Sequence, residues 1–427
     1  MTSTTARERL GRVLRRQPAD AIPVDFGGTS VTGIHVRMVE LLRRHYGLPA
    51  GPVKVIEPYQ MLGEVAADLR EAMGIDVVGI SPRTTLFGFE NCGWREFRTF
   101  WGQVVLVPEG FQTALDEDGD LVIYPGGDRT ARPSGRMPKA GFFFDTIVRQ
   151  DPIEESRLDP EDNLEEFAPL DERDVAYWRA QVAALEGTTS GVIANVGGTA
   201  LGDIALVPAP WLKDPKGIRD VAEWYVSTRA RPDYVHAVFD RQTEIAIGRL
   251  RTLQEIAGEL VQALFLCGTD FGTQGSQFCS AETFRELYLP YYRRMNDWIH
   301  RHTSWKTFKH SCGSVAPLIT AFADAGFDIL NPVQVNAAGM DPQRLKDEHG
   351  SRVIFWGGGA DTQKVLPFGT PQQVEEHVLR QCEIFSRGGG FVFNTVHNVQ
   401  ANVPVENVAA MVRAVKRFNG ATAQEGP

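Results

Sequence analysis

Three features of the sequence predict an α/β protein whose parallel strands close into a (β/α)8 barrel with a β-rich insertion. Segments of helical periodicity alternate with short segments that are apolar on both faces, a pattern typical of a parallel sheet covered by helices. Roughly eight such strands can be counted, which is the number that a closed barrel needs. The length of 427 residues accommodates one barrel with an insertion. A doubly wound open sheet is the alternative architecture.

The N-terminal part of the chain begins the alternation. Leu10, Val13 and Leu14 recur at helical spacing, and Pro18 ends the helix that they predict. The segment IPVDFGG is a short strand that runs into a glycine turn, and GIDVVGI is a second strand. In order, we expect a helix over 6–16, a strand over 22–28, helices over 34–46 and 65–73, and a strand over 74–80.

Residues 84–150 interrupt this pattern. The stretches WREFRTFWGQVVLVP and DEDGDLVIYPGG predict short antiparallel strands, and DGD supplies a turn. The acidic segment 151–168 is expected to be a surface loop. The predicted organisation is therefore a single barrel spanning 1–427, with a β-rich insertion at about 84–150.

The alternation resumes after the acidic loop. Ser280 is placed to cap a long helix. The expected helices cover 171–185, 220–229, 233–257, 281–302, 315–325, 342–349, 371–387 and 405–418. The expected strands are GVIANVGG, ALFLCGTDFG, WKTFKHSCG, DILNPV, VIFWGGGAD and FVFNTVHN. About five successive strand–helix units in this half favour the barrel over the open sheet.

Composition excludes several classes of protein. The net charge of −10 is spread along the chain without a basic stripe, which argues against nucleic-acid binding. Five cysteines at irregular spacings do not make a disulfide framework. The N-terminus is too polar for a signal peptide, and no run of about 18 apolar residues predicts a membrane span. These features predict a cytoplasmic protein.

Polar side chains follow most of the later strands. In a barrel the carboxyl ends of all strands meet at one face, so these side chains are expected to share one mouth. They are Cys267, Asp270, His310, Cys312, Asn331, Gln334, residues 357–359, Asp361, Asn394, His397 and Asn398.

Two of these side chains have metal-ligand spacing. His310 and Cys312 lie two residues apart in an extended segment, so they point to the same side. An imidazole and a thiolate at this spacing can bind one Zn²⁺, and a catalytic zinc has about three protein ligands and an open position. His397, at the end of another strand, is the third candidate ligand. The alternatives are a structural histidine beside a packed cysteine, and a metal-free acid/base role for His397.

The remaining candidates carry other roles. Asp270 either acts at the mouth or caps a turn, and with His397 it forms the predicted catalytic acid/base pair. Asn331, Gly358 and Asp361 are predicted to contact a bound cofactor, because they end neighbouring strands and glycine permits close approach to the backbone. Asp270 and Asp361 are also candidate oxygen ligands for a metal.

Four stretches resemble the uroporphyrinogen decarboxylase superfamily, in its methyltransferase-like branch. They are RERLGRVLRRQPADAIPVDFGG, GTDFGTQGSQFCSAETFRELYLPYYRRMNDWIHRH, KHSCGSVAPLI and NVPVENVAAM. They are similar to the family's opening helix and strand, its central block, its metal-binding strand and its last helix. The resemblance covers nearly the whole chain, least clearly the insertion, and implies a TIM barrel. It also implies a homodimer.

The chain departs from the decarboxylases of this family. Those enzymes use no metal, hold substrate with an arginine-rich N-terminal segment and carry a catalytic Asp after an early strand. Here the first strand has no such arginines, and Ser81 and Pro82 stand where the Asp is expected. The resemblance therefore argues against decarboxylation of a tetrapyrrole.

The methyltransferase branch implies a zinc site. Its members hold zinc with His-x-Cys and a distant Cys, and His310 and Cys312 match the first two ligands. This chain has no Cys at the last strand end, where His397 is the nearest candidate. The leading hypothesis is thus a zinc-dependent methyltransferase or demethylase that moves a methyl group between a small methylated substrate or thiol and a corrinoid. The corrinoid is carried by a partner protein or bound as substrate.

Two other hypotheses stay open. A metal-free decarboxylase or lyase on the same barrel predicts acid/base work by Asp270 and His397. A non-catalytic barrel predicts ligand binding without turnover, because a fold does not decide function.

Overall fold

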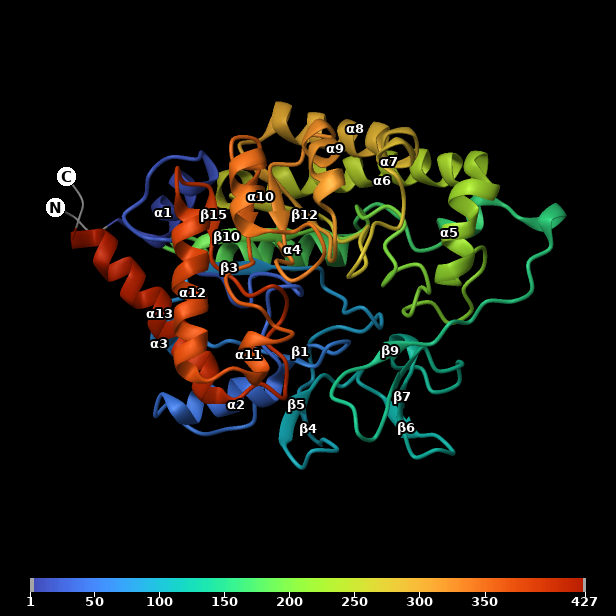
Figure 1. The fold of residues 1–427 in the computed structure, drawn as a ribbon. Helices are drawn as coiled ribbons and strands as arrows, with labels where there is room; N and C mark the ends of the chain where they lie inside the picture. The colour runs from blue at the N-terminus through green and yellow to red at the C-terminus, as the bar shows by residue number, and fades with distance from the viewer. Residues whose placement is uncertain (1–3, 425–427) are drawn as a thin grey trace.

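The computed structural model describes residues 4–424. Figure 1 shows a central sheet surrounded by helices and, in the lower part of the view, a separate group of antiparallel strands. The helices are α1 (Ala6–Leu14), α2 (Val36–His45), α3 (Ala67–Met73), α4 (Glu172–Ala184), α5 (Val221–Ala230), α6 (Pro232–Ala257), α7 (Ala281–Leu287), α8 (Leu289–His302), α9 (Ile319–Asp324), α10 (Pro342–His349), α11 (Val365–Phe368), α12 (Pro371–Ser386) and α13 (Val405–Gln424).

The strands fall into one parallel sheet and three small antiparallel sheets. They are β1 (Val55–Glu57), β2 (Leu62–Gly63), β3 (Val77–Ile80), β4 (Arg95–Arg98), β5 (Val104–Val107), β6 (Thr113–Leu115), β7 (Leu121–Ile123), β8 (Gly135–Met137), β9 (Asp145–Thr146), β10 (Gly191–Asn195), β11 (Ala263–Cys267), β12 (Lys306–His310), β13 (Ile329–Asn331), β14 (Ile354–Trp356) and β15 (Phe391–Val392).

The parallel sheet closes into a barrel. Seven strands pair in the order β15-β14-β13-β12-β11-β10-β3, and each pair is parallel. Its two edges are joined by the expected first strand, which is reduced here to an isolated bridge at Val24. The Asp25 N–H donates to the Phe393 carbonyl on one side (2.9 Å), and the Asp76 N–H donates to the Val24 carbonyl on the other (2.8 Å). The predicted fold class is confirmed.

One end of the barrel is plugged by α1. Leu10, Val13 and Leu14 join a buried cluster with side chains from the barrel strands, as their helical spacing predicts. The strand members are Val77, Ile193, Ala263, Phe265, Phe308, Ile329, Ile354, Trp356 and Val392. On β12 the inward side chain that follows Phe308 is His310, two residues closer to the carboxyl end. The site residues therefore lie above a packed interior, toward the carboxyl ends of the strands.

The long helix expected over 281–302 is two helices. Ser280 caps the first, as predicted, by accepting a hydrogen bond from the Thr283 N–H. The break falls at Tyr288, between α7 and α8. Pro290 explains it, because proline has no N–H to donate and its ring clashes with the preceding turn.

The segment between β3 and α4 carries two of the antiparallel sheets. β4 pairs with β5, and β6 to β9 form a four-stranded sheet. This segment follows the carboxyl end of a barrel strand, which is the face where active sites of such barrels form. Hydrogen bonds tie it to neighbouring loops there, from His35 Nε2 to the Phe142 carbonyl (2.9 Å) and from the Phe144 N–H to the Tyr59 carbonyl (2.8 Å).

A helix that crosses a bilayer must be both long and apolar, and this can be judged for the helices of residues 4–424. None of them is long and apolar enough to cross a membrane.

Candidate functional site

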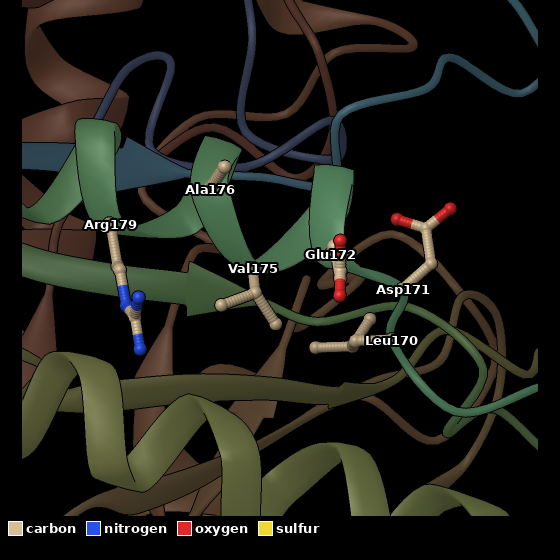
Figure 2. Close-up of a pocket in the computed structure, with 6 residues that line it drawn as sticks. All are labelled: Leu170, Asp171, Glu172, Val175, Ala176 and Arg179. Atoms are coloured by element: carbon tan, nitrogen blue, oxygen red, sulfur yellow. The ribbon is translucent and has the colours of Figure 1, made fainter.

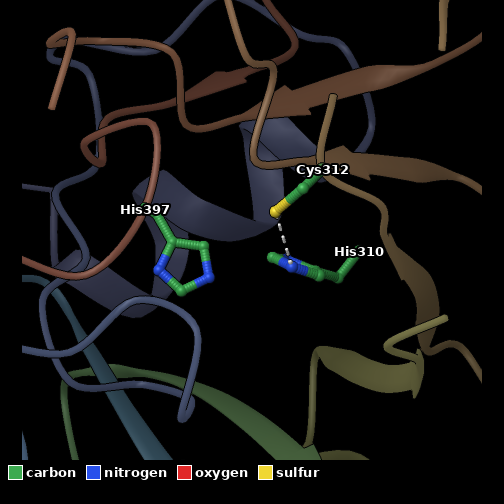
Figure 3. Close-up of side chains that lie close together, drawn as sticks. All are labelled: His310, Cys312 and His397. Atoms are coloured by element: carbon green, nitrogen blue, oxygen red, sulfur yellow. Dashed lines mark hydrogen bonds between the residues drawn. The ribbon is translucent and has the colours of Figure 1, made fainter. Parts of the chain in front are cut away.

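Three predicted ligands come together at the mouth of the barrel. One ligand atom from each of His310, Cys312 and His397 lies within 4.8 Å of the other two. Cys312 Sγ is 3.4 Å from His310 Nε2, and the two imidazole rings are 5.5 Å apart between centroids. Figure 3 shows the thiol and the His397 ring approaching the His310 ring. His310 ends β12, Cys312 follows it, and His397 lies in the loop after β15. We call these three candidate metal ligands the metal cluster.

Asn331 orients His310. The Asn331 amide nitrogen donates to the Trp356 carbonyl (2.7 Å), so its oxygen faces His310 Nδ1 at 2.5 Å. His310 must therefore carry its proton on Nδ1, and Nε2 keeps the lone pair that points into the cluster. Metal-bound histidines are held by outer partners of this kind. Asn331, predicted as a cofactor contact, lies behind His310.

Both imidazoles are neutral near pH 7. Burial lowers the pKa of His310 to about 4, and the Lys309 ammonium acts in the same direction. Burial and then the His310 ring lower the pKa of His397 to about 4. A neutral imidazole has a free lone pair, so both rings are in the state that metal binding requires.

The thiol and a carboxylate meet beside the rings. The Cys312 N–H donates to Asp270 Oδ1 at 2.6 Å, and the same oxygen is 3.7 Å from His310 Nε2. Burial, and then the negative charge of Asp270, raise the pKa of the Cys312 thiol well above its ordinary value. The free thiol is thus protonated, and a bound metal would be needed to draw out the thiolate.

The protonation of Asp270 is set by opposing effects. Burial raises the pKa of Asp270, whereas the Cys312 N–H and the Lys309 ammonium favour the charged carboxylate. The predicted catalytic pair, Asp270 and His397, is close enough that each group alters the pKa of the other.

The donor set fits a zinc ion. Two imidazole nitrogens and one thiolate are ordinary zinc ligands, and three protein ligands leave one tetrahedral position for a substrate or water. The fixed tautomer of His310 and the neutral state of both rings agree with this use.

Two other predicted contacts have backbone roles. Asp361 Oδ1 accepts hydrogen bonds from the Gln363 N–H (2.7 Å) and from the Asn336 amide (2.9 Å), so it organises a turn before α11. Gly358 has a φ of +77°, and a Cβ there would lie 2.9 Å from the Val333 carbonyl oxygen. The backbone alone therefore accounts for this glycine, and both cofactor contacts stay predictions.

The sequence did not point to Asp203. It lies in the loop between β10 and α5 and is only 8% exposed. Burial and then the charge of Asp270 raise the pKa of Asp203 to about 6. The only signal in the sequence was its position shortly after the apolar strand GVIANVGG. The loops that follow barrel strands commonly supply active-site residues.

Two tyrosines also face this part of the mouth. The Tyr225 hydroxyl donates to the Asp270 carbonyl (3.3 Å), and its ring stacks on Phe278 with centroids 4.8 Å apart. Tyr59 lies near enough for Asp203 and Asp270 to raise its pKa, after burial and two other carboxylates. Sequence analysis missed both, because neither ends a strand of the barrel.

A surface hollow of about 400 Å³ lies elsewhere, along the start of α4 (Figure 2). Its lining residues are Leu170, Asp171, Glu172, Val175, Ala176 and Arg179. Asp171 caps α4 by accepting from the Asp174 N–H, so it is committed to the helix. None of the predicted site residues lines this hollow, and we assign it no chemistry.

Comparison with known proteins identifies relatives. Methylated-thiol–coenzyme M methyltransferase from Methanosarcina mazei is 29% identical over 208 residues, which are 47% of this chain and 48% of the relative. A uroporphyrinogen decarboxylase from Methylococcus capsulatus is 33% identical over 103 residues, 24% of this chain and 27% of the relative. The matched segment thus spans about half or less of the length of these relatives.

A solved structure and a family profile extend these matches. A methyltransferase from Methanosarcina mazei superposes with a TM-score of 0.55 at 15% identity, covering 97% of this chain and 99% of that one, which supports the fold. The uroporphyrinogen decarboxylase (URO-D) profile matches residues 204–418, half of the chain. The protein therefore belongs to the uroporphyrinogen decarboxylase family, as its sequence predicts.

Proposed function

We propose that this protein is a zinc-dependent methyltransferase that moves a methyl group between a small methylated substrate or thiol and a corrinoid. The observation that carries the proposal is the metal cluster, in which His310, Cys312 and His397 present three zinc-type ligand atoms within 4.8 Å. The similarity to a methylated-thiol methyltransferase of Methanosarcina mazei supports methyl transfer as the reaction class.

Each residue of the cluster has a defined task. His310, Cys312 and His397 would hold the ion, and Asn331 keeps the Nε2 lone pair of His310 turned toward it. A bound zinc supplies Lewis-acid charge, which lowers the pKa of a thiol or polarises the leaving atom of a methylated substrate. Asp270 accepts the Cys312 N–H and so fixes the loop that carries the thiol.

The third ligand bears on the choice of substrate. Two imidazoles and one thiolate make a harder donor set than one imidazole and two thiolates. A harder site favours oxygen or nitrogen at the open position. We therefore propose methyl ethers or methylated amines alongside thiols as partners of the reaction.

The corrinoid and the quaternary structure complete the proposal. We propose that the corrinoid reaches the mouth on a partner protein or as a free substrate, and that the chain forms a homodimer. Mixing the protein with a reduced corrinoid and a methyl donor tests the methyl transfer to the corrinoid, because methylation of cobalt changes the visible spectrum. A spectrum that stays unchanged with ether, amine and thioether donors contradicts it.

A metal-free decarboxylase or lyase is the second proposal. It is favoured by one observation, the buried Asp270 carboxylate with its raised pKa beside neutral imidazoles. Such a group can act as a general acid or base. It predicts that Asp270→Asn abolishes turnover while removal of metal has no effect.

Metal analysis separates the two proposals. We expect about one zinc per chain in the wild-type protein and much less in His310→Ala, Cys312→Ser and His397→Ala. Exposed residues of the same types, in His45→Ala and Cys92→Ser, are the matched controls and should leave zinc unchanged. A wild-type protein that binds no zinc when it is supplied contradicts the zinc-dependent proposal.

A further inference from the structure

A second buried carboxylate lies at the same mouth. Asp203 Oδ1 accepts a hydrogen bond from the Ala205 N–H at 3.0 Å. Its other oxygen rests against Gly268, directly after β11, where a Cβ would lie only 2.6 Å from Oδ2. The absence of a side chain at Gly268 therefore leaves the room that this carboxylate fills.

Asp203 lies within electrostatic reach of the metal cluster. Gly268 is two residues before Asp270, whose Oδ1 is 3.7 Å from His310 Nε2. The charge of Asp203 contributes to the raised pKa of the Cys312 thiol. It also contributes to the raised pKa of the Tyr225 hydroxyl. Because Gly268 directly follows β11, the Asp203 carboxylate lies at the carboxyl end of the barrel, beside the strand that leads to Asp270.

The two buried carboxylates have different partners. Asp270 Oδ1 accepts the Cys312 N–H at 2.6 Å, and Asp203 Oδ1 accepts the Ala205 N–H, which leaves Asp203 Oδ2, beside Gly268, to carry a proton. Burial raises the pKa of both groups, and the charge of Asp270 raises that of Asp203 further. Two nearby carboxylates in unequal settings divide into a base and an acid. The charged and titratable groups that face Asp203 are Asp270, Lys309, Cys312, Tyr59 and Tyr225.

We propose that Asp203 is the general acid that protonates the leaving atom when a methyl ether or thioether loses its methyl group at this site. The inference rests on the proposed methyl transfer. The electron pair of the nucleophile, a reduced corrinoid or a thiolate, forms the new bond to the methyl carbon. The carbon–oxygen or carbon–sulfur bond breaks, its electron pair stays on the leaving atom, and that atom takes the proton of Asp203. The resulting carboxylate recovers a proton from water.

This role selects a class of substrate. An ether or thioether leaves as a basic anion, so a proton donor stabilises its transition state. A quaternary ammonium or a sulfonium leaves as a neutral molecule and gains nothing from an acid. The presence of Asp203 therefore points to neutral methylated oxygen or sulfur compounds.

The test compares leaving groups of different basicity. Aryl methyl ethers, from anisole to nitroanisole, are presented with a reduced corrinoid to wild type and Asp203→Asn. We expect the variant to lose about 10²-fold or more in kcat with the most basic leaving group and little with nitrophenolate, while KM stays similar. The fall of the wild-type rate as pH rises through about 6 should disappear in the variant.

Two further variants sharpen the result. Asp214→Asn alters an exposed carboxylate farther along the same loop and should behave as wild type. Gly268→Ala places a methyl group against Asp203 Oδ2 and should show the same leaving-group dependence in weaker form, which keeps the test available if Asp203→Asn does not fold. Zinc content should be unchanged in all three.

The outcomes separate this inference from the proposed function. If Asp203→Asn slows all ethers equally or none of them, the assignment of Asp203 as the acid is overturned. If wild type binds zinc and demethylates only cationic donors, the inference is overturned and methyl transfer stands. If wild type shows neither zinc nor methyl transfer, both are overturned.

Discussion

Replacing Asn331 with alanine tests how the metal cluster is held. Asn331 is fully buried, and its amide joins the His310 imidazole to the Trp356 carbonyl through hydrogen bonds of 2.5 and 2.7 Å. The substitution leaves one buried donor and one buried acceptor without partners, and each costs about 1–3 kcal/mol. We therefore expect the free energy of unfolding of the metal-free protein to fall by about 2–6 kcal/mol, as measured by urea denaturation.

The same substitution should weaken zinc binding. Without Asn331 the His310 ring is free to rotate and to place its proton on Nε2, where the lone pair is needed. Loss of such an outer partner typically reduces metal affinity by about 10–100-fold. Competition for zinc with a chromophoric chelator measures this change directly, without any assay of activity.

Asn296 on α8 provides a matched control. It is also fully buried, and its amide donates to the Ala325 carbonyl at 2.8 Å, outside the cluster. Asn296→Ala should lower stability without changing zinc affinity. If Asn331→Ala likewise leaves zinc affinity unchanged, Asn331 only supports packing and the argument from the tautomer of His310 is wrong.

Three other predictions follow from the same structure. Zinc affinity should increase about tenfold for each unit by which the pH is raised toward neutrality, because only Cys312 must lose a proton to bind metal. Chelator competition at several pH values measures this dependence. Burial lowers the pKa of His310 from 6.5 to about 4, so as pH falls through this range only the unfolded chain takes up the proton. His310 should therefore account for about 3 kcal/mol of the stability that the metal-free protein loses on acidification, and His310→Gln should lose correspondingly less than wild type in urea titrations. Finally, a Cβ on Gly79 would lie 1.9 Å from the Gly28 carbonyl oxygen, so Gly79→Ala should destabilise the barrel by about 3 kcal/mol, whereas Gly248→Ala, with open space around it on α6, should be neutral or stabilising in thermal unfolding.

Local pattern was sufficient for most of the framework. Apolar runs placed the strands β10 to β15, and helical spacing placed the plug formed by Leu10, Val13 and Leu14. The pattern misjudged the helix over 281–302, which Pro290 divides. It also overstated the first strand, which the structure reduces to an isolated bridge at Val24.

The spacing of residues along the sequence also predicted the three candidate metal ligands. His310 and Cys312 are two residues apart at a strand end, and the rule that strand ends meet at one face of a barrel brought in His397. That rule works because parallel strands share a direction. It says nothing about which side chains lie behind the ligands or reach in from long loops.

The sequence by itself determined the fold class, the family and the three residues of the metal cluster, because these depend on periodicity and on residues at the ends of regular strands. Only the tertiary structure decided that Asn331 holds the His310 tautomer, and that Asp361 serves a turn. It alone placed Asp203 beside Gly268. The reason is physical: hydrogen bonding and burial, which set protonation, arise between segments distant in sequence, and no local pattern records which of them come into contact.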